Sequence, residues 1–441
     1  MAIEINNFSL PISPEEARTI LQRQTDEFGV FFDLDRILEY EANYSYEMYK
    51  LYKPFRQMAG DPRLEVTKTD EIRNVVMSRF KVPEYKLMNK YGKQSIDAGV
   101  REQLLADESL SDDTREFIRI FHKLSNLRYY RSYLQQYKSL PLSNCLDCHG
   151  HRMVIGHPRW ELLATSRIAA KDPSIQNIAR DLPDLITEPK GWKLVRADSG
   201  QIEPRINFSH FLRDELIVNL IKAYNDAYFG MLHYVLLSDE EDAMLRADFE
   251  STFQIHEVTD AMKEKRQTIK TLTNAGSYGS SNLGNIDRDL AAAFDKRIVK
   301  HPARLAFESK VRKDVANGVE TFYGAFGTPV TPGETDKYKR NEKGWTEHLV
   351  RCGINNPVQT TASELMIFSV YNADKLLRKS KNSHICYYKH DEGCFYIHED
   401  EMDLLEKVKG LTAYNVKGWI PIDSDAIVGV KENKNVPSIL S

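Results

Sequence analysis

The spacing of hydrophobic and polar residues along the chain predicts long helices separated by short strands. A helix is predicted to begin at Pro14, because Ser13 is a preferred N-cap residue and proline is tolerated at the first helical position. Val30–Asp33 then has the apolar character of a strand or a turn. Long charged helices follow to about residue 140, and the pattern of residues 210–350 is also mostly helical.

Two β-rich stretches carry acidic residues where a strand ends. Trp192–Asp198 is predicted to be a short buried strand with Asp198 at its C-terminal end, and Ile385–Ile397 is predicted to be a hairpin with His390–Gly393 at its tip. Asp198 and the hairpin residue Asp391 could hold a divalent metal between them, because a small number of hard oxygen ligands suits Mg²⁺. Taken alone, Asp198 would more often cap the following helix.

A third stretch carries cations at helical spacing. Arg266, Lys270, Asn274 and Tyr278 follow one another at four-residue intervals, so they share one slowly spiralling helix face. Two cations one turn apart can bind a triphosphate, while Asn274 and Tyr278 would lie further along, near a base. The alternative is a solvated helix face, which is the usual place of surface charges.

Composition and charge restrict the class of protein. A length of 441 residues predicts two or three domains. The net charge is −4 at pH 7, so a nucleic-acid-binding chain must concentrate its basic groups on one surface. No apolar run is long enough to span a membrane, and no signal peptide is recognisable. Five cysteines without a secretory signal predict reduced thiols in the cytoplasm.

A short cysteine- and histidine-rich segment allows two interpretations. Cys145, Cys148, His149 and His151 lie within seven residues, and a Cys-x2-Cys pair with nearby histidines could bind a structural Zn²⁺. The crowding of these residues, and the lack of an obvious second pair, favour loop cysteines in a β-hairpin. The sequence leaves both interpretations open.

The three stretches around Asp198, Arg266 and Asp391 together resemble motifs A, B and C of family A DNA polymerases, the bacterial polymerase I type. The family's Asp-Tyr-Ser-Gln-Ile-Glu-Leu-Arg is similar to Asp198–Arg205, its Arg-x3-Lys-x3-(Phe/Tyr)-x3-Tyr-Gly to Arg266–Gly279, and its Val-His-Asp-Glu to Lys389–Glu392. Three motifs in the right order are far more specific than one alone, and the resemblance covers roughly residues 20–435.

The resemblance implies an α+β fold with the right-hand polymerase architecture, in which the palm is an antiparallel sheet and the thumb and fingers are largely helical. The implied domains are an N-terminal helical region with the thumb at 1–143, the palm at 144–208 and 350–441, and the fingers at 209–349. A chain of this length is expected to be a polymerase module without proofreading or 5′-nuclease domains. Its expected location is the cytoplasm, that of a bacterial host if a phage or plasmid encodes it.

The resemblance also implies a reaction, template-directed DNA synthesis. The primer 3′-hydroxyl would attack the α-phosphorus of a dNTP, with two Mg²⁺ or Mn²⁺ ions held by Asp198, Asp391 and the Ser199 carbonyl, and with Glu392 in a secondary role. Lys270 would be the catalytic cation and could donate a proton to pyrophosphate. The implied dNTP-binding residues are Arg266, Lys270, Asn274, Tyr278, Glu203, Gln201 and Tyr228. The residues implied at the primer–template are Arg167, Gln176, Asn177, Gln359, His390, Lys123 and Arg128.

The sequence departs from the family at two positions. Asn274 stands where phenylalanine or tyrosine is usual, and Tyr228 stands where histidine is expected, so nucleotide affinity and sugar choice are open. Glu203 matches the family's steric gate against a 2′-hydroxyl.

Two alternatives to a DNA-synthesising enzyme remain. One is a related polymerase with relaxed sugar or template choice, against which Glu203 argues. The other is a non-catalytic accessory subunit that binds primer–template, against which the retained Asp198 and Asp391 argue. Expected partners are DNA and dNTPs, and a separate exonuclease, helicase–primase or processivity factor. No membrane partner is expected.

Overall fold

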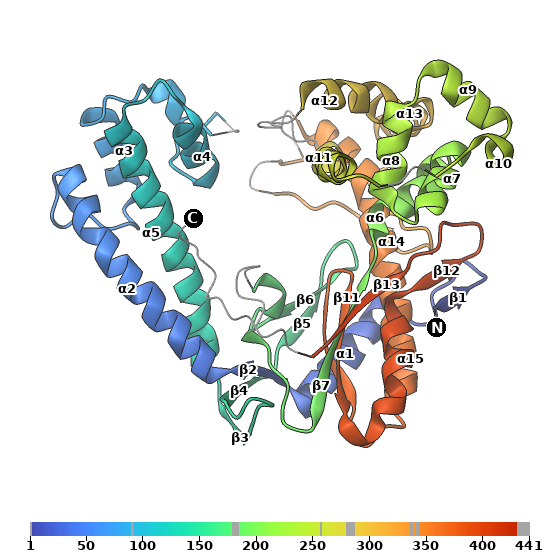
Figure 1. Cartoon of the computed structure of the whole chain (residues 1–441), viewed down its shortest axis with the longest axis horizontal. Helices are drawn as coiled ribbons and strands as arrows, with labels where there is room; N and C mark the ends of the chain where they lie inside the picture. The colour runs from blue at the N-terminus through green and yellow to red at the C-terminus, as the bar shows by residue number, and fades with distance from the viewer. Residues whose placement is uncertain are drawn as a thin grey trace. The chain divides into compact units, whose positions relative to one another are not determined.

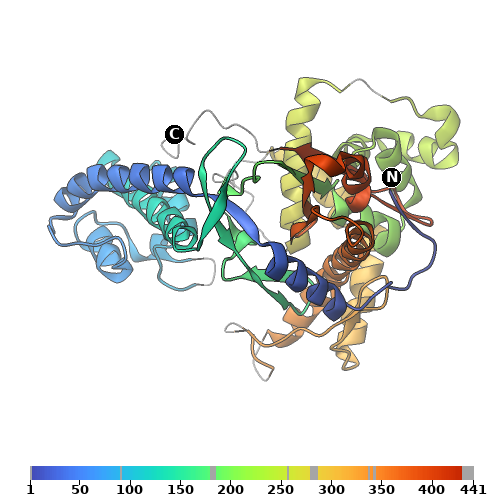
Figure 2. The same ribbon diagram turned by 90° about the horizontal axis from the view of Figure 1, so that it is seen from below.

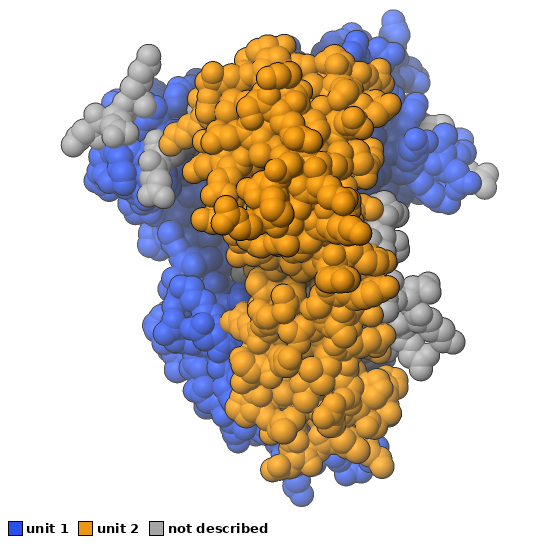
Figure 3. Space-filling model, turned by 90° about the vertical axis from the view of Figure 1, so that its left-hand side faces the viewer, with its two compact units in different colours: residues 1–29, 157–176, 191–429 blue, residues 30–156, 177–190, 430–441 orange. Residues whose placement is uncertain are grey.

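The chain forms two compact units in the computed structural model (Figure 3). The described residues are 2–89, 92–178, 185–255, 258–278, 287–335, 338–340 and 344–429, without the side chains of 177 and 274–278. Among them, unit 1 contains residues 2–29, 157–176 and 191–429, and unit 2 contains residues 30–156 and 177–190. Each unit therefore combines segments that are distant in the sequence.

Unit 2 is built on two long helices that lie side by side (Figure 1). They are α2 (Leu34–Ala59) and α5 (Asp112–Lys138). Phe55 of α2 stacks on Phe117 of α5 with ring centroids 5.2 Å apart, and both side chains are fully buried. Two shorter helices, α3 (Thr69–Ser78) and α4 (Ala98–Ala106), belong to the same unit. An antiparallel sheet, in the order β2-β4-β3, is formed by β2 (Val30–Asp33), β3 (Leu142–Leu146) and β4 (Arg152–Gly156).

Unit 1 contains a four-stranded antiparallel sheet in the order β10-β11-β7-β13. Its strands are β7 (Trp192–Ser199), β10 (His384–Lys389), β11 (Glu392–His398) and β13 (Ser424–Val428). The central strands have almost wholly buried, apolar side chains such as Leu194, Phe395 and Ile397. Two helices, α1 (Pro14–Phe28) and α14 (Trp345–Leu377), pack against each other and against β10, as Figures 1 and 2 show.

Smaller strand pairs and a short helix complete this part of unit 1. The parallel pair joins β1 (Ile3–Ile5) to β12 (Tyr414–Val416). The antiparallel pairs are β5 (Arg159–Leu162) with β6 (Ile168–Lys171), and β8 (Phe322–Tyr323) with β9 (Pro329–Val330). The short helix α15 (Leu405–Lys409) contacts β7.

The rest of unit 1 is helical and surrounds a separate apolar core. Its helices are α6 (Ile202–Ile206), α7 (Glu215–Tyr224), α8 (Ala227–Leu236), α9 (Asp239–Ala247), α10 (Phe249–Thr252), α11 (Asp260–Tyr278), α12 (Arg288–Phe294) and α13 (Pro302–Ala316). Ile269 and Leu272 of α11 are buried in this core together with Leu220 of α7 and Met231 of α8. Lys270, the next residue to Ile269, is exposed, so one face of α11 is anchored and another remains accessible.

Several local predictions are confirmed. Ser13 caps α1 at its N-terminus in a reciprocal capping box with Glu16, and Gly29 follows its last turn. The His390–Asp391 segment is the two-residue turn between β10 and β11, as the hairpin pattern predicts. No helix of the described segments is both long and apolar enough to cross a membrane.

A glycine allows α7 and α8 to approach closely. A Cβ added at Gly230 would lie 2.8 Å from Cα, N and Cγ1 of Ile221 on α7. Because two of these atoms belong to the backbone, an alanine here can be accommodated only if the helices move apart.

Gly230→Ala is therefore expected to lower the free energy of unfolding by about 1–3 kcal/mol, the usual cost of overpacking, measured as a lower melting temperature by calorimetry. Gly99→Ala in α4 is the control, since its added Cβ meets only Asp97 Oδ1 at 3.5 Å and alanine is the better helix former. Equal melting temperatures for the two variants would contradict the close packing of α7 and α8.

Candidate active site

Asp198 lies between two other carboxylates in the four-stranded sheet. It pairs in register with Glu392 of β11 on one side and with Asp425 of β13 on the other. Residues paired in this way have side chains on the same face of the sheet, about 4.5–5.5 Å apart at Cβ. Asp198 and Asp425 are exposed on this face and Glu392 is half-buried, so three acidic side chains form a row across three strands.

Backbone hydrogen bonds bring the second predicted metal ligand to the end of β7. The Ser199 N–H donates to the carbonyl of Asp391 at 3.0 Å, and the Gly200 N–H donates to the carbonyl of Asp423 at 2.8 Å. The turn that holds Asp391 is tight, since His390 has a φ of 55° in the left-handed region. The two carboxylates predicted from distant parts of the sequence are therefore held together by the main chain.

Burial and like charges raise the pKa values of these acids. The pKa of Asp198 is raised to about 7, first by loss of water around the carboxylate and then by the charges of Asp391, Glu392 and Asp425, whereas Lys270 opposes the shift. Because the Asp198 side chain is exposed in the sheet, we give the like charges more weight than the loss of water. The pKa of Asp391 is also raised, by burial and by Glu203 and Glu392, while Arg167 lowers it.

This excess of negative charge fits a divalent cation. The donors are carboxylate and carbonyl oxygens, which are the ligands that Mg²⁺ and Mn²⁺ prefer. A cation bound between Asp198 and Asp391 would relieve the repulsion that raises both pKa values. Glu392 is engaged on its inner side, where its Oε1 accepts bonds from the Tyr387 hydroxyl at 3.4 Å and the Cys394 thiol at 3.3 Å.

Helix α11 carries the two cations predicted from the sequence. Lys270 acts electrostatically on Asp198, and its Nζ lies 5.9 Å from the centre of the Tyr228 ring. One turn earlier, Arg266 forms an ion pair with Asp226, with Nη2 and Oδ2 2.6 Å apart. The two predicted cations thus lie on the face of α11 nearest the carboxylates. The side chains of Asn274 and Tyr278 lie outside the described residues.

One pocket is lined by several of the residues predicted to bind the nucleotide or the primer–template. Its lining includes Arg167, Gln201, Glu203, Tyr228, His390 and Asp391. Within it, Arg167 Nη2 donates to Glu203 Oε1 at 2.8 Å. Tyr228 is almost fully buried, so its ring forms the floor beneath the two cations rather than an exposed contact.

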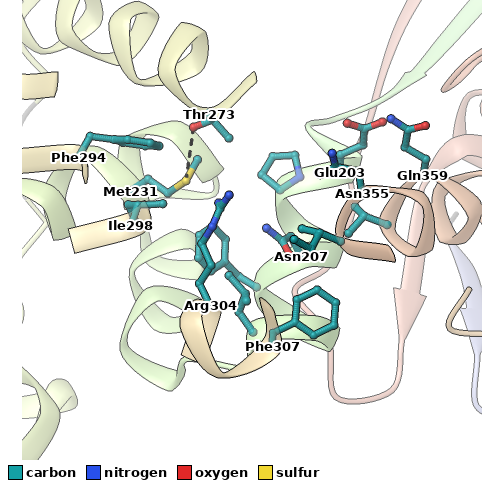
Figure 4. Close-up of a pocket in the computed structure, with 15 residues that line it drawn as sticks. Glu203, Asn207, Met231, Thr273, Phe294, Ile298, Arg304, Phe307, Asn355 and Gln359 are labelled. Carbon is teal, nitrogen blue, oxygen red and sulfur yellow. Dashed lines mark hydrogen bonds between the residues drawn. The ribbon is translucent and has the colours of Figure 1, made fainter. Parts of the chain in front are cut away.

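A second pocket adjoins Glu203, as Figure 4 shows. The side chains of Glu203 and Gln359 lie on one side of it, and Met231, Thr273 and Phe294 lie on the other (Figure 4). This pocket is lined by both apolar and amide side chains. Gln359 is thereby brought beside Glu203, although the two positions are 156 residues apart in the sequence.

The remaining primer–template candidates occur in different environments. The Gln176 amide donates to the carbonyls of Ile168 and Tyr388, at 2.7 and 2.9 Å, and accepts from the Ala170 N–H at 3.1 Å, so it braces the sheet next to the pocket. In unit 2, Arg128 of α5 is exposed and Lys123 is half-buried. The side chain of Asn177 lies outside the described residues.

The cysteine- and histidine-rich segment spans the end of β3 and the turn before β4, and a zinc site there stays a prediction. Cys145 lies in β3, and both Cys145 and His149 are exposed. His151 Nδ1 lies 2.8 Å from Asp33 Oδ2, and Asp33, Asp147 and His151 are the described group of three metal-type ligands within 4.8 Å of one another. Asp147 accepts the His149 and His151 N–H bonds at 2.8 Å each, so the histidines are drawn into a hydrogen-bonded turn.

Two carboxylates have partners that the sequence did not show. Asp425 reaches Asp198 only through the pairing of β13 with β7. Asp226, two residues before Tyr228 in the segment that resembles the family's Asp-x-His, holds both Arg266 and Gln201. Both contacts are long-range, so neither partner could be read from the neighbouring residues.

Comparisons with known proteins agree with this geometry. A family model described as DNA polymerase family A matches residues 34–431. The chain is 23% identical over 440 residues to DNA polymerase I of Caldicellulosiruptor bescii, covering 93% of this chain and 45% of that protein. It is 23% identical over 401 residues to DNA polymerase I of Bacillus subtilis, covering 87% of this chain and 41% of that protein. The chain thus spans less than half the length of these curated relatives.

A solved structure has the same fold. The POL domain of Pol1 from M. smegmatis, in complex with DNA primer-template and dNTP, superposes with a TM-score of 0.72 at 18% sequence identity. The match covers 94% of this chain and 69% of that chain. The α+β fold with an antiparallel palm sheet and helical thumb and fingers, expected from the sequence, is confirmed. The residue boundaries of the domains stay predictions.

Asp198 is expected to make the metal-free protein less stable as the pH rises. Its pKa is about 7 in the folded chain and about 3.9 in an unfolded chain, so the folded state holds more protons between these values and stability falls as the pH rises through this window. In EDTA at pH 8, Asp198→Asn should therefore melt at a higher temperature than the parent protein, and the difference should shrink towards pH 5.

Two controls accompany the melting experiment. Excess Mg²⁺ should remove the advantage of Asp198→Asn at pH 8, because a bound cation neutralises the carboxylate in the parent. Asp403→Asn, which alters an exposed carboxylate outside the site, should leave the pH dependence unchanged. If Asp198→Asn melted no higher than the parent in EDTA at pH 8, the repulsion between these carboxylates would be disproved.

Proposed function

The chain belongs to DNA polymerase family A, and on that premise we propose that it extends a DNA primer on a DNA template, adding dNMP from dNTP and releasing pyrophosphate. The observation that carries this proposal is the meeting of Asp198 and Asp391 at the end of β7, opposite the cations of α11. Carboxylates on one side and cations on the other are what an in-line phosphoryl transfer requires.

Asp198, Asp391 and the Ser199 carbonyl would hold two divalent cations, Mg²⁺ or Mn²⁺. When bound, such ions lower the pKa of a primer 3′-hydroxyl and neutralise charge on the leaving pyrophosphate. The chain's own contribution is to keep the two carboxylates at a fixed separation, because the Ser199–Asp391 hydrogen bond ties their backbones together. Glu392 and Asp425 add negative charge beside Asp198 and so raise its affinity for cations.

Arg266 and Lys270 would bind the triphosphate, which spans about one helical turn. Lys270, exposed near Asp198, is suited to donate a proton to the leaving pyrophosphate. The buried Tyr228 ring lies under both cations, 5.2 Å from the Arg266 guanidinium and 5.9 Å from Lys270 Nζ, and so supports their positions without needing to touch the nucleotide. This accounts for the tyrosine at a family histidine position.

Glu203 would restrict the sugar. Its carboxylate is held by Arg167 at 2.8 Å, in the pocket that also contains Asp391 and Gln201. A fixed acidic side chain beside the sugar leaves no room for a 2′-hydroxyl. Arg167, Gln359 and His390 would contact the primer–template near its end, and Lys123 and Arg128 of α5 would contact its phosphates.

Primer extension on a DNA template with Mg²⁺ is the first test. The parent chain is expected to extend with dNTPs, and Asp391→Asn should lower kcat by about 10²–10³-fold or more, the usual cost of removing a charge-stabilising group. Primer–template affinity, measured by fluorescence anisotropy, should change little. Asp403→Asn is the matched control and should extend normally. Intact primer–template binding without extension by the parent, under any divalent metal, would favour an accessory binding subunit.

Glu203→Ala tests sugar choice in the same assay. Removing the side chain should raise rNTP incorporation relative to dNTP by about 10- to 200-fold, the range that steric exclusion of one small group supplies. Single-nucleotide kcat/KM values for dATP and ATP give this ratio. If the parent protein already uses dATP and ATP equally well, the proposed role of Glu203 is wrong, while the proposed metal ligands are unaffected.

A further inference from the structure

Arg266 is held in place by a carboxylate that the sequence analysis did not assign to the site. Its Nη2 donates to Asp226 Oδ2 at 2.6 Å, and its Nε lies 3.0 Å from the same oxygen and 3.1 Å from Oδ1. Only 25% of the Arg266 side chain and 17% of the Asp226 side chain are exposed. Two charge-assisted bonds from the Nε/Nη2 edge of a guanidinium to one carboxylate fix its plane as well as its position.

Asp226 is itself fixed by other parts of unit 1. Its Oδ1 caps α8 by accepting the Phe229 N–H at 2.8 Å, and its Oδ2 accepts Gln201 Nε2 at 2.6 Å. The Ala227 N–H in turn donates to the side-chain carbonyl oxygen of Gln201. Burial alone would raise the pKa of Asp226, but the donors Arg266, Phe229 and Gln201 keep it below its usual range.

These bonds connect the two halves of the proposed site. Gln201 lies three residues after Asp198, at the turn that follows β7, and adopts a left-handed φ of 54°. Arg266 lies on α11, one turn before Lys270. Asp226 bonds to both Gln201 and Arg266, so this carboxylate links the turn after β7 to helix α11.

Two aromatic rings next to Asp226 also lie against the guanidinium of Arg266. Arg266 lies over Tyr228 at 5.2 Å and over Phe229 at 5.3 Å from the ring centres. Asp226 accepts hydrogen bonds from Nε and Nη2, and within the described residues no hydrogen bond involves Nη1. The outer edge of the fork is therefore the one available to a ligand.

We propose that Asp226 is a positioning residue that aims the outer edge of Arg266 at the nucleotide triphosphate. The inference rests on the proposed function for the identity of the ligand. Asp226 does not touch the nucleotide and acts only through Arg266. Removing its negative charge would increase the attraction for phosphate, but an unheld arginine must be ordered at every binding event, and we expect the loss of orientation to dominate.

The test compares Asp226→Asn with the parent in the full chain. Asparagine is also a good N-cap, so α8 keeps its cap while the charged acceptor for Arg266 is lost. The dissociation constant for dATP with Mg²⁺, measured by calorimetry, should rise about 5- to 30-fold, as expected for a side chain that must be reordered on binding. The kcat/KM for dATP in primer extension should fall by a similar factor.

Two further variants separate positioning from folding. In an Arg266→Ala background, Asp226→Asn should have no additional effect on dATP affinity, because the proposed route from Asp226 to the nucleotide runs through Arg266; a remaining effect would assign it to Gln201 or to the fold of α8 and overturn the proposal. Asp214→Asn is the matched control, since Asp214 caps α7 through the Ile217 N–H at 2.9 Å and pairs with Arg246 at 3.0 Å, away from the site. It should lower the melting temperature and leave dATP affinity unchanged.

The other possible results of these measurements also test the proposed role of Asp226. Tighter dATP binding by Asp226→Asn would mean that Asp226 competes with the triphosphate for Arg266, which overturns positioning. An equal loss with and without Arg266 would assign the effect to the fold of α8, which also overturns it. If Asp226→Asn weakens dATP binding as expected but the parent extends no primer, the proposed function fails and the role of Asp226 stands. A parent that binds no dATP would overturn both.

Discussion

The candidate active site depends on the backbone hydrogen bonds that hold like charges together. Asp198, Glu392 and Asp425 lie on adjacent strands in register, and the Ser199 N–H fixes the turn that carries Asp391. The carboxylates repel one another, as the raised pKa values of Asp198 and Asp391 indicate. The backbone hydrogen bonds between the strands and the apolar packing of β7 and β11 offset this repulsion. The folded sheet therefore keeps the carboxylates close together, and a bound divalent cation would reduce the repulsion between them.

The helical part of unit 1 carries a small number of cations that oppose this negative charge. Helix α11 is anchored by Ile269 and Leu272 in an apolar core, which leaves Lys270 exposed towards Asp198. Arg266 is balanced by Asp226 rather than left as a lone charge. The site therefore combines one cation that is held in a fixed orientation with one that is able to move, and this division suits binding on the one hand and proton transfer on the other.

The resemblance to the family carried most of the site prediction, and the structure explains why the partners of two carboxylates were missed. Motif residues such as Asp198 and Asp391 are recognisable because their neighbours in the sequence repeat a known pattern. Asp425 has no such neighbours, and its place beside Asp198 follows from the pairing of β13 with β7. The same holds for the Cys and His residues at 145–151, which are close in sequence: Asp33 and Asp147 are the groups that His151 meets in space.

The sequence by itself determined the local elements and the chemistry. The capping box at Ser13, the two-residue turn at His390–Asp391 and the four-residue spacing on α11 are short-range patterns, and each depends on interactions within a few residues. Only the tertiary structure decided which charges meet. Strand order, register and the grouping of residues 2–29 with residues 191–429 arise from long-range packing. A charge's effect depends on its distance from other charges, and that distance is set by the fold rather than by separation along the chain.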